Sequence, residues 1–163
     1  MKKSTKFIIA LLVTVGALAI TYRVVNQAPS KDLAADAQMQ EIITSGGCLQ
    51  CHSGSPDLPF YANWPVASGM VQKDVTQGYR AFDMTEMAEA LKAGKPVGKV
   101  ALAKVEKVIM DGTMPKHAYY MVHWGSSVTD AKKEMAMAWV KQHRLAHSVS
   151  YTHLRAHETR RHL

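Results

Sequence analysis

The hydrophobic pattern of the chain begins with a continuous apolar run near the N-terminus. Three lysines precede an uncharged stretch from Phe7 to Tyr22, and Arg23 follows it. As a helix this stretch would be about 24 Å long, slightly less than the roughly 30 Å hydrocarbon core of a bilayer. The Arg23 side chain can reach the interface from within the lipid, so the two valines after it can extend the span. We therefore expect residues 1–25 to form one membrane anchor whose N-terminus lies in the cytoplasm, on the side of the lysines.

A cleaved signal peptide is the alternative for this segment. The triplet Ala17–Ala19 has the small-residue pattern of a cleavage site. It lies inside the apolar run with no polar segment before it, which favours an uncleaved anchor. Both alternatives place the rest of the chain outside the cytoplasm, in an oxidising compartment.

Residues 26–31 are expected to form a linker. After this linker the pattern becomes that of helices joined by long turns. The stretch Ser53–Gly69 is rich in Pro, Gly and aromatic residues, so it is not expected to be regular throughout. No segment shows the strict alternation of a strand. The pattern therefore predicts an all-α domain over residues 32–147. Its expected helices cover residues 32–44, ended by Gly46-Gly47; residues from a Thr85 cap to Gly94; residues 102–109, ended by Gly112; and residues from Thr129 to about Arg144.

The last segment, residues 148–163, has no apolar period. It resembles translated adapter sequence, so we expect it to be foreign to the fold, and a metal site built from its histidines 153, 157 and 162 is not favoured. Residues 149–163 carry three arginines and one glutamate, so without them the net charge falls from +7 to +5. The basic balance therefore gives no argument for nucleic-acid binding.

Cys48-Leu49-Gln50-Cys51-His52 is the segment with the clearest chemistry. Two thiols separated by two residues can reach both vinyl groups of a haem from one turn, and the adjacent histidine can ligate its iron. We expect one covalent haem c held by Cys48 and Cys51, with His52 as an axial ligand. The alternatives are a disulfide and half of a zinc site. A thioredoxin-like pair would follow a strand, and zinc would need two more ligands at short spacing.

The second axial ligand is expected in the segment Asp111–Pro115. Gly112 ends a helix, and Pro115 stiffens the chain behind Met114, whose thioether can then be held against iron. Methionine ligation raises the potential relative to two histidines and suits electron transfer. The alternative ligands are His117, His123, Met110 and Met121. The methionines more typical of core filling are Met39, Met84, Met87, Met135 and Met137.

Apolar and aromatic residues around these ligands are expected to line the haem pocket. His123 has two further interpretations, as a hydrogen-bond partner of a haem propionate or as an ordinary half-buried histidine. The candidate pocket residues are Phe60, Tyr61, Trp64, Phe82, Pro115, His123 and Trp124.

The motifs also occur in a recognisable order. Between about Leu33 and Leu145 the chain resembles the N-terminal mono-haem domain of membrane-anchored tri-haem bacterial cytochrome c peroxidases, the quinol peroxidases, and related haem-binding domains. The resemblance implies a small cytochrome c-like helical domain that passes electrons from membrane quinol to a di-haem domain that reduces hydrogen peroxide. The segments that carry it are Cys48–His52, Leu58–Tyr61, Gly78–Phe82, Leu102–Glu106, Gly112–Pro115 and His123–Gly125.

The chain departs from that family in one respect. A di-haem peroxidase domain needs two further Cys-x-x-Cys-His motifs, and this chain has only two cysteines. We expect it not to be catalytic alone but to be a truncated electron-entry domain. Its partners would be a membrane quinol or small redox donor and the missing di-haem domain. The expected location is the inner membrane, single pass, with the haem domain in the periplasm. The alternative is a stand-alone sensor or ligand-binding domain with an open iron position.

Overall fold

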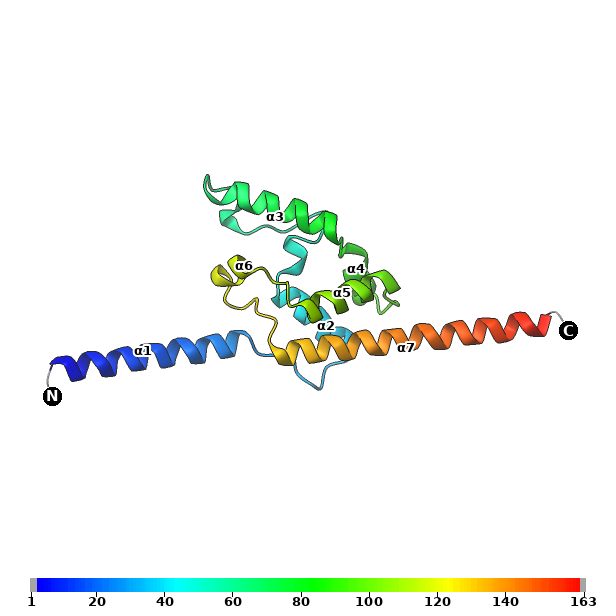
Figure 1. The fold of residues 1–163 in the computed structure, drawn as a ribbon, viewed down its shortest axis with the longest axis horizontal. Coiled ribbons are helices and arrows are strands. Elements are labelled where there is room, and N and C mark those ends of the chain that lie inside the picture. Colours follow the sequence, from blue (N-terminus) through cyan, green and yellow to red (C-terminus); the bar gives the residue numbers. More distant parts are fainter. Residues whose placement is uncertain (1–2, 162–163) are drawn as a thin grey trace.

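The structure, a computed structural model, describes the backbone of residues 3–161 and the side chains of residues 3–148. Every regular element within that range is helical, which confirms the all-α prediction. Figure 1 shows a helical body from which α1 and α7 extend in opposite directions. The elements are α1 Lys3–Val25, α2 Ala35–Ser45, η1 Cys48–Gln50, η2 Phe60–Asn63, α3 Ala67–Ala81, α4 Thr85–Lys92, α5 Lys99–Asp111, α6 His117–Val122 and α7 Asp130–Arg161.

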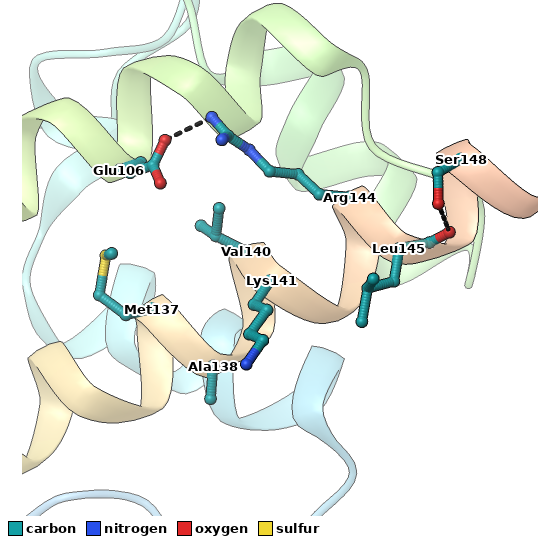
Figure 2. A pocket seen from close by; sticks show the side chains of 8 residues that line it. All are labelled: Glu106, Met137, Ala138, Val140, Lys141, Arg144, Leu145 and Ser148. Atoms are coloured by element: carbon teal, nitrogen blue, oxygen red, sulfur yellow. Dashed lines mark hydrogen bonds and ion pairs between the residues drawn. The ribbon is translucent and has the colours of Figure 1, made fainter.

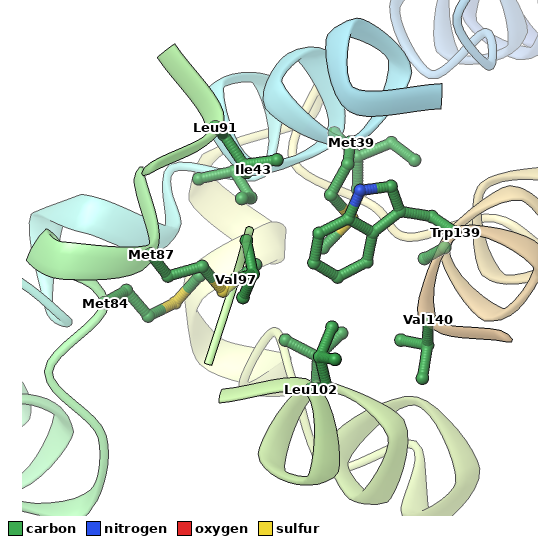
Figure 3. Close-up of a cluster of buried hydrophobic side chains, with 12 residues drawn as sticks. Met39, Ile43, Met84, Met87, Leu91, Val97, Leu102, Trp139 and Val140 are labelled. Atoms are coloured by element: carbon green, nitrogen blue, oxygen red, sulfur yellow. The ribbon is translucent and has the colours of Figure 1, made fainter. Parts of the chain in front are cut away.

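The hydrophobic core lies where α2, α4 and α5 meet the first half of α7 (Figure 3). Trp139 on α7 is 1% exposed and packs among side chains of these helices. Three methionines expected to fill the core do so, and Met135 packs against it. The buried cluster comprises Met39, Ile42, Ile43, Met84, Met87, Leu91, Val97, Leu102, Val105, Ala136, Trp139 and Val140.

Several helix boundaries follow the predicted glycine signals. Gly112 ends α5 with φ +61°, a left-handed conformation that a side chain would strain. Gly46 and Gly47 end α2, and Gly94 follows α4. The predicted cap at Thr85 is wrong, because Thr85 is the first helical residue and its N–H donates to Asp83 Oδ1 at 2.9 Å. Asp83 therefore satisfies a free amide at the start of α4.

Two helices were not predicted, and one is longer than expected. α3 was missed although Val71, Val75 and Tyr79 stand at helical spacing, because its two glycines were taken as signs of irregular structure, and α6 was missed because it is a six-residue helix. The expected irregular stretch Ser53–Gly69 contains only η2 before α3 begins. α7 continues to Arg161, so the helix runs past the expected end near Arg144. The side chains of the histidines considered as a metal site lie outside the described residues.

α1 has the length and composition of a membrane span. Its most apolar window has a mean hydropathy of 2.2, and among the described residues it is the helix that meets this criterion. A signal sequence shares these properties, so the helix fits both interpretations of the N-terminus. None of its side chains is buried in the body, which is the distribution expected of a helix that packs against lipid.

Candidate functional site

The turn that carries both cysteines begins where α2 ends. Gly47 has φ +64°, and a Cβ at this position would lie 2.1 Å from the Tyr119 hydroxyl, so only glycine fits. After it, η1 places Cys48 and Cys51 one helical turn apart, with the Cys51 and His52 amides both donating to the Cys48 carbonyl at 3.3 and 3.0 Å. Both thiols are free. The turn thus presents two unbonded sulfurs and an imidazole from one short segment.

His52 is oriented by the segment that joins α3 to α4. Its Nδ1 lies 2.8 Å from the Phe82 carbonyl oxygen, and its own carbonyl accepts a 2.7 Å hydrogen bond from the Met84 amide. Since a carbonyl can only accept, Nδ1 carries the proton and Nε2 is left with a lone pair. A backbone acceptor on one ring nitrogen is the usual arrangement that orients a histidine for a metal on the other.

α3 lies directly against Cys51. A Cβ on Gly78 would lie 2.6 Å from the Cys51 carbonyl oxygen and 3.0 Å from its Cβ. The neighbouring turn of α3 carries Asp74, which pairs with Lys116 Nζ at 2.6 Å. This ion pair ties the segment just after Met114 and Pro115 to the same helix. α3 is therefore the element that joins the cysteine turn to the loop before α6.

A hydrogen-bonded group of aromatic side chains also contacts the cysteine turn. The Tyr119 hydroxyl donates to Gln50 Oε1 at 2.6 Å, and the Tyr119 ring stacks on His123 with centroids 3.9 Å apart. His123 Nδ1 lies 3.0 Å from the Tyr119 carbonyl, so its Nε2 accepts from the Tyr61 hydroxyl at 2.7 Å. This group connects η2, α6 and the cysteine turn. Gln50, Tyr119 and Gly78 were not among the predicted site residues, although Gln50 and Gly78 fall within two of the segments that carry the family resemblance.

The thiols lie in a poorly solvated environment. Burial raises the pKa of Cys48 to about 11, and burial together with Asp74 raises the pKa of Cys51. The same cause raises the pKa of Tyr119 to about 12. Redox-active cysteine pairs and zinc ligands instead lie where the thiolate is favoured. The surroundings of these thiols therefore favour the protonated form.

Other candidate metal ligands are not gathered at the motif. Within the described residues no cluster of three or more His, Cys, Asp or Glu side chains could hold a metal ion. His143 Nε2 donates to Asp36 at 2.8 Å, and His147 bonds the Val97 carbonyl at 2.7 Å, so both serve α7 packing. The zinc alternative therefore lacks its further ligands in this part of the chain.

The predicted pocket residues divide into two groups by exposure. Tyr61, Phe82, Pro115 and His123 are half-buried, as is Met114. Three aromatic side chains are exposed, namely Phe60 at 82%, Trp64 at 56% and Trp124 at 46%. Of the alternative ligands, His117, Met110 and Met121 are exposed. The structure thus brings Cys48, Cys51, His52, Phe82, Tyr61 and His123 together around one turn.

A separate groove of about 550 Å³ lies between α5 and α7 (Figure 2). Glu106 and Arg144 form an ion pair across it, and the apolar part comes from α7. No predicted site residue lines it. The lining residues are Glu106, Met137, Ala138, Val140, Lys141, Arg144, Leu145 and Ser148.

An all-helical domain that presents two free thiols and a carbonyl-bonded imidazole on one turn has the donor set of a haem-binding domain. The comparison with known families agrees: the sequence pattern described as "Haem-binding domain" matches residues 7–142. The chain therefore belongs to the haem-binding domain family. The matched range includes most of α1 and ends within α7.

One curated relative is named as a cytochrome c peroxidase. The chain is 35% identical over 104 residues to the cytochrome c peroxidase Ccp of Escherichia coli (strain K12). The match covers 64% of this chain and 22% of that protein, so the chain spans about a fifth of its relative's length. No solved structure matches. The resemblance inferred from the ordered motifs is thereby confirmed at the level of a haem-binding domain related to a cytochrome c peroxidase.

Proposed function

We propose that this chain is a membrane-anchored c-type haem domain that relays electrons one at a time. The observation that carries the proposal is the Cys48–His52 turn, in which two free thiols and an oriented imidazole come from consecutive residues. Membership of the haem-binding domain family supports haem as the ligand. The covalent attachment, the axial ligands and the relay are the parts that remain to be tested.

Cys48 and Cys51 would hold the haem through two thioether bonds. Each thiol would add across one vinyl group, with its sulfur on one carbon and its hydrogen on the other, so no oxidant would be needed. The raised pKa of both thiols favours the protonated form that would supply this hydrogen. Attachment at two points removes the need for high intrinsic affinity, because the bonds do not reverse.

His52 and Met114 would hold the haem iron. The Phe82 carbonyl holds the His52 proton on Nδ1, which keeps Nε2 as the donor. Pro115 follows Met114 and the Lys116–Asp74 pair fixes the next residue, which limits the motion of the thioether. When bound, a haem iron with histidine and methionine ligands supplies a one-electron ferric–ferrous couple suited to transfer.

The relay would join a donor at the membrane to a peroxidase. α1 would fix the domain at the inner membrane, with the haem site on the periplasmic side, where a membrane quinol or small redox donor can reach it. The relationship to a cytochrome c peroxidase supports a di-haem peroxidase domain as the acceptor. In this arrangement the chain binds and positions a redox group, and reduction of peroxide takes place elsewhere.

Attachment is tested by mass. The chain, exported in a bacterium that matures c-type cytochromes, is expected to be heavier than its polypeptide by one haem. Cys48→Ala and Cys51→Ala variants should each lose one thioether bond, and the double variant should release its haem in acidified organic solvent. A parent protein without added mass would refute covalent attachment.

The Met114→Ala variant tests the second axial ligand. We expect it to lose the low-spin ferric spectrum and the weak far-red methionine band and to bind carbon monoxide readily when reduced. Met110→Ala is the matched control, because Met110 lies nearby at the end of α5 and is 73% exposed, and the change should leave the spectrum unchanged. An unaltered Met114→Ala spectrum would exclude this ligand, and fast carbon monoxide binding by the parent would favour the sensor alternative with an open iron.

A further inference from the structure

The C-terminal end of α1 is bonded to the body of the domain. Asn26, just after α1, is 3% exposed; its Nδ2 donates to the Trp124 carbonyl at 2.6 Å and its Oδ1 accepts from the Ser127 amide at 3.0 Å. One turn earlier, the Tyr22 hydroxyl bonds Ser127 Oγ at 2.8 Å, and its ring meets Trp124 edge to face. The helix is thus held at a defined orientation by the segment that follows α6.

Two stretches of the domain carry no charged residue. Residues 58–72 and 117–129 contain no Asp, Glu, Lys or Arg, although such residues make up 20% of the chain. At that frequency each stretch would be expected to carry about three. Two of the three tryptophans, Trp64 and Trp124, fall in these stretches. Charge depletion with exposed tryptophan is typical of surfaces at a membrane interface, where the indole ring prefers the headgroup level.

The apolar side chains of these stretches are exposed. Val66 is 87% exposed, Met70 67%, Met121 61% and Val122 71%. Isolated exposed apolar residues are ordinary, but a contiguous set marks an interaction surface. We call this set, together with Trp64 and Trp124, the uncharged face.

The uncharged face lies on the side of the body from which α1 extends. Figure 1 shows α6 and the start of α3 on that side, away from the direction of α7. The Tyr61–His123 hydrogen bond at 2.7 Å joins η2, in the first stretch, to the residue that follows α6 in the second. Because Trp124 also contacts Tyr22 of α1, the surface is continuous with the expected membrane span.

We propose that the uncharged face rests on the lipid interface beside α1, so that the domain contacts the membrane at a second place. The inference rests on the proposed membrane anchor. Trp64 and Trp124 are also candidate pocket residues and Met121 is an alternative iron ligand, so the test of the lipid contact uses Val66 and Val122, which have neither assignment. The contact fixes the distance of the cysteine turn from the bilayer, since Tyr119 and His123 join that turn to α6.

Lipid photo-crosslinking tests the proposal on the full chain with its haem. The photoreactive residue p-benzoylphenylalanine is placed at Val122 or at Val66, and the protein is reconstituted into vesicles of phosphatidylethanolamine and phosphatidylglycerol. We expect phospholipid adducts at both positions, with yields several-fold above those at Val100. Val100 is the matched control, because it is 71% exposed like Val122 but lies on α5. Absorption spectra confirm that each variant retains folded haem domain.

Val13 on α1 is the positive control, because it tests the proposed membrane anchor separately from the proposed lipid contact of the uncharged face. Adducts at Val13 without adducts at Val122 and Val66 would overturn the inference and leave the anchor intact. Crosslinks from Val122 or Val66 to haem instead of lipid would also overturn it, because the face would then belong to the pocket. Absence of lipid adducts at Val13 would refute the anchor itself, and the lipid contact with it.

Discussion

Gly78 and Gly47 determine how closely other elements approach the cysteine turn. At Gly78 on α3 the Cys51 carbonyl takes the place that a side chain would occupy, and at Gly47 the Tyr119 hydroxyl does so. Both glycines therefore allow close packing against the turn, whose two cysteines are half-buried. The raised pKa values of Cys48 and Cys51 have the same origin in burial.

Gly78→Ala is expected to destabilise the domain. Its new Cβ would lie 2.6 Å from the Cys51 carbonyl oxygen, so α3 must move. Overpacking of this kind costs about 1–3 kcal/mol, partly offset by about 1 kcal/mol of helix propensity. Chemical denaturation should show a net loss in the free energy of unfolding. Gly69→Ala, on the same helix with no atom within 4 Å, should be neutral or slightly stabilising; equal effects of the two changes would contradict the close contact.

Lys132 is a buried cation that makes stability depend on pH. It is 1% exposed, and its Nζ donates to the Ser127 carbonyl at 3.2 Å and to Ser45 Oγ at 3.4 Å. Burial lowers its pKa below the ordinary 10.5, against a smaller opposing effect of Glu41. The unfolded chain therefore binds more protons in the alkaline range, and stability should rise as the pH increases from the lowered pKa toward 10.5.

The comparison of wild type with Lys132→Met isolates this effect. The cost of the buried charge is fully present at neutral pH and is relieved as the lysine loses its proton. The wild type should therefore gain free energy of unfolding relative to Lys132→Met as the pH rises toward 10.5. Urea denaturation at a series of pH values measures the difference, and a difference independent of pH would refute the assignment.

At the scale of elements, α2 and α7 are joined by one carboxylate. Asp36 Oδ1 accepts from Trp139 Nε1 at 2.7 Å and from His143 Nε2 at 2.8 Å, and the indole is almost fully buried. α2 ends at the cysteine turn, so this connection transmits the position of α7 to the site. The groove between α5 and α7 lies on a different face of α7 and contributes nothing to the turn.

Asp36→Ala is expected to lower the free energy of unfolding by about 1–3 kcal/mol, because a buried indole N–H loses its acceptor. Asp111→Ala is the matched control, since it removes an exposed ion pair with Lys107 on one helix, worth about 0.5 kcal/mol or less. Thermal unfolding of both variants measures the contrast. Equal losses would show that the Asp36 bonds add nothing beyond a surface pair.

At the scale of the whole molecule, α7 is longer than the domain that it supports. Within the described side chains, its contacts with the body extend to His147, which bonds the Val97 carbonyl. We proposed from the sequence that the segment from residue 148 onward is foreign to the fold. The backbone of this segment continues α7 as a helix. A helix can extend beyond a domain in this way without contributing to its core.

Shortened chains test this interpretation. A chain ending at Ser148 is expected to keep its unfolding temperature and haem content, because it retains the bonds of His143, Arg144 and His147. A chain ending at Gln142 loses all three and should unfold at a lower temperature. If removal of residues 149–163 alone destabilises the protein as much as the shorter truncation, the segment is part of the fold.

The sequence by itself determined the features that depend on neighbouring residues. Three such features are the apolar run of α1, the glycines that end α2 and α5, and the spacing of Cys48, Cys51 and His52. Helix periodicity, left-handed glycine and a two-residue thiol spacing can each be read from a few consecutive positions. Five methionines were predicted to fill the core because the chain has many of these adaptable side chains; three lie in the buried cluster, Met135 packs against it, and Met137 is not part of it.

Only the tertiary structure decided which distant groups meet at the turn. The carbonyl that orients His52 lies 30 residues away, and Tyr119 reaches Gln50 across 69 residues. α6 is too short to carry a clear period, and the apolar period of α3 does not tell which element the helix packs on; their places follow from the contacts of Gly78 with Cys51 and of His123 with Tyr61. The physical reason is that a hydrogen bond between remote residues depends on how whole helices pack, and packing is a property of the assembled core that no short segment encodes.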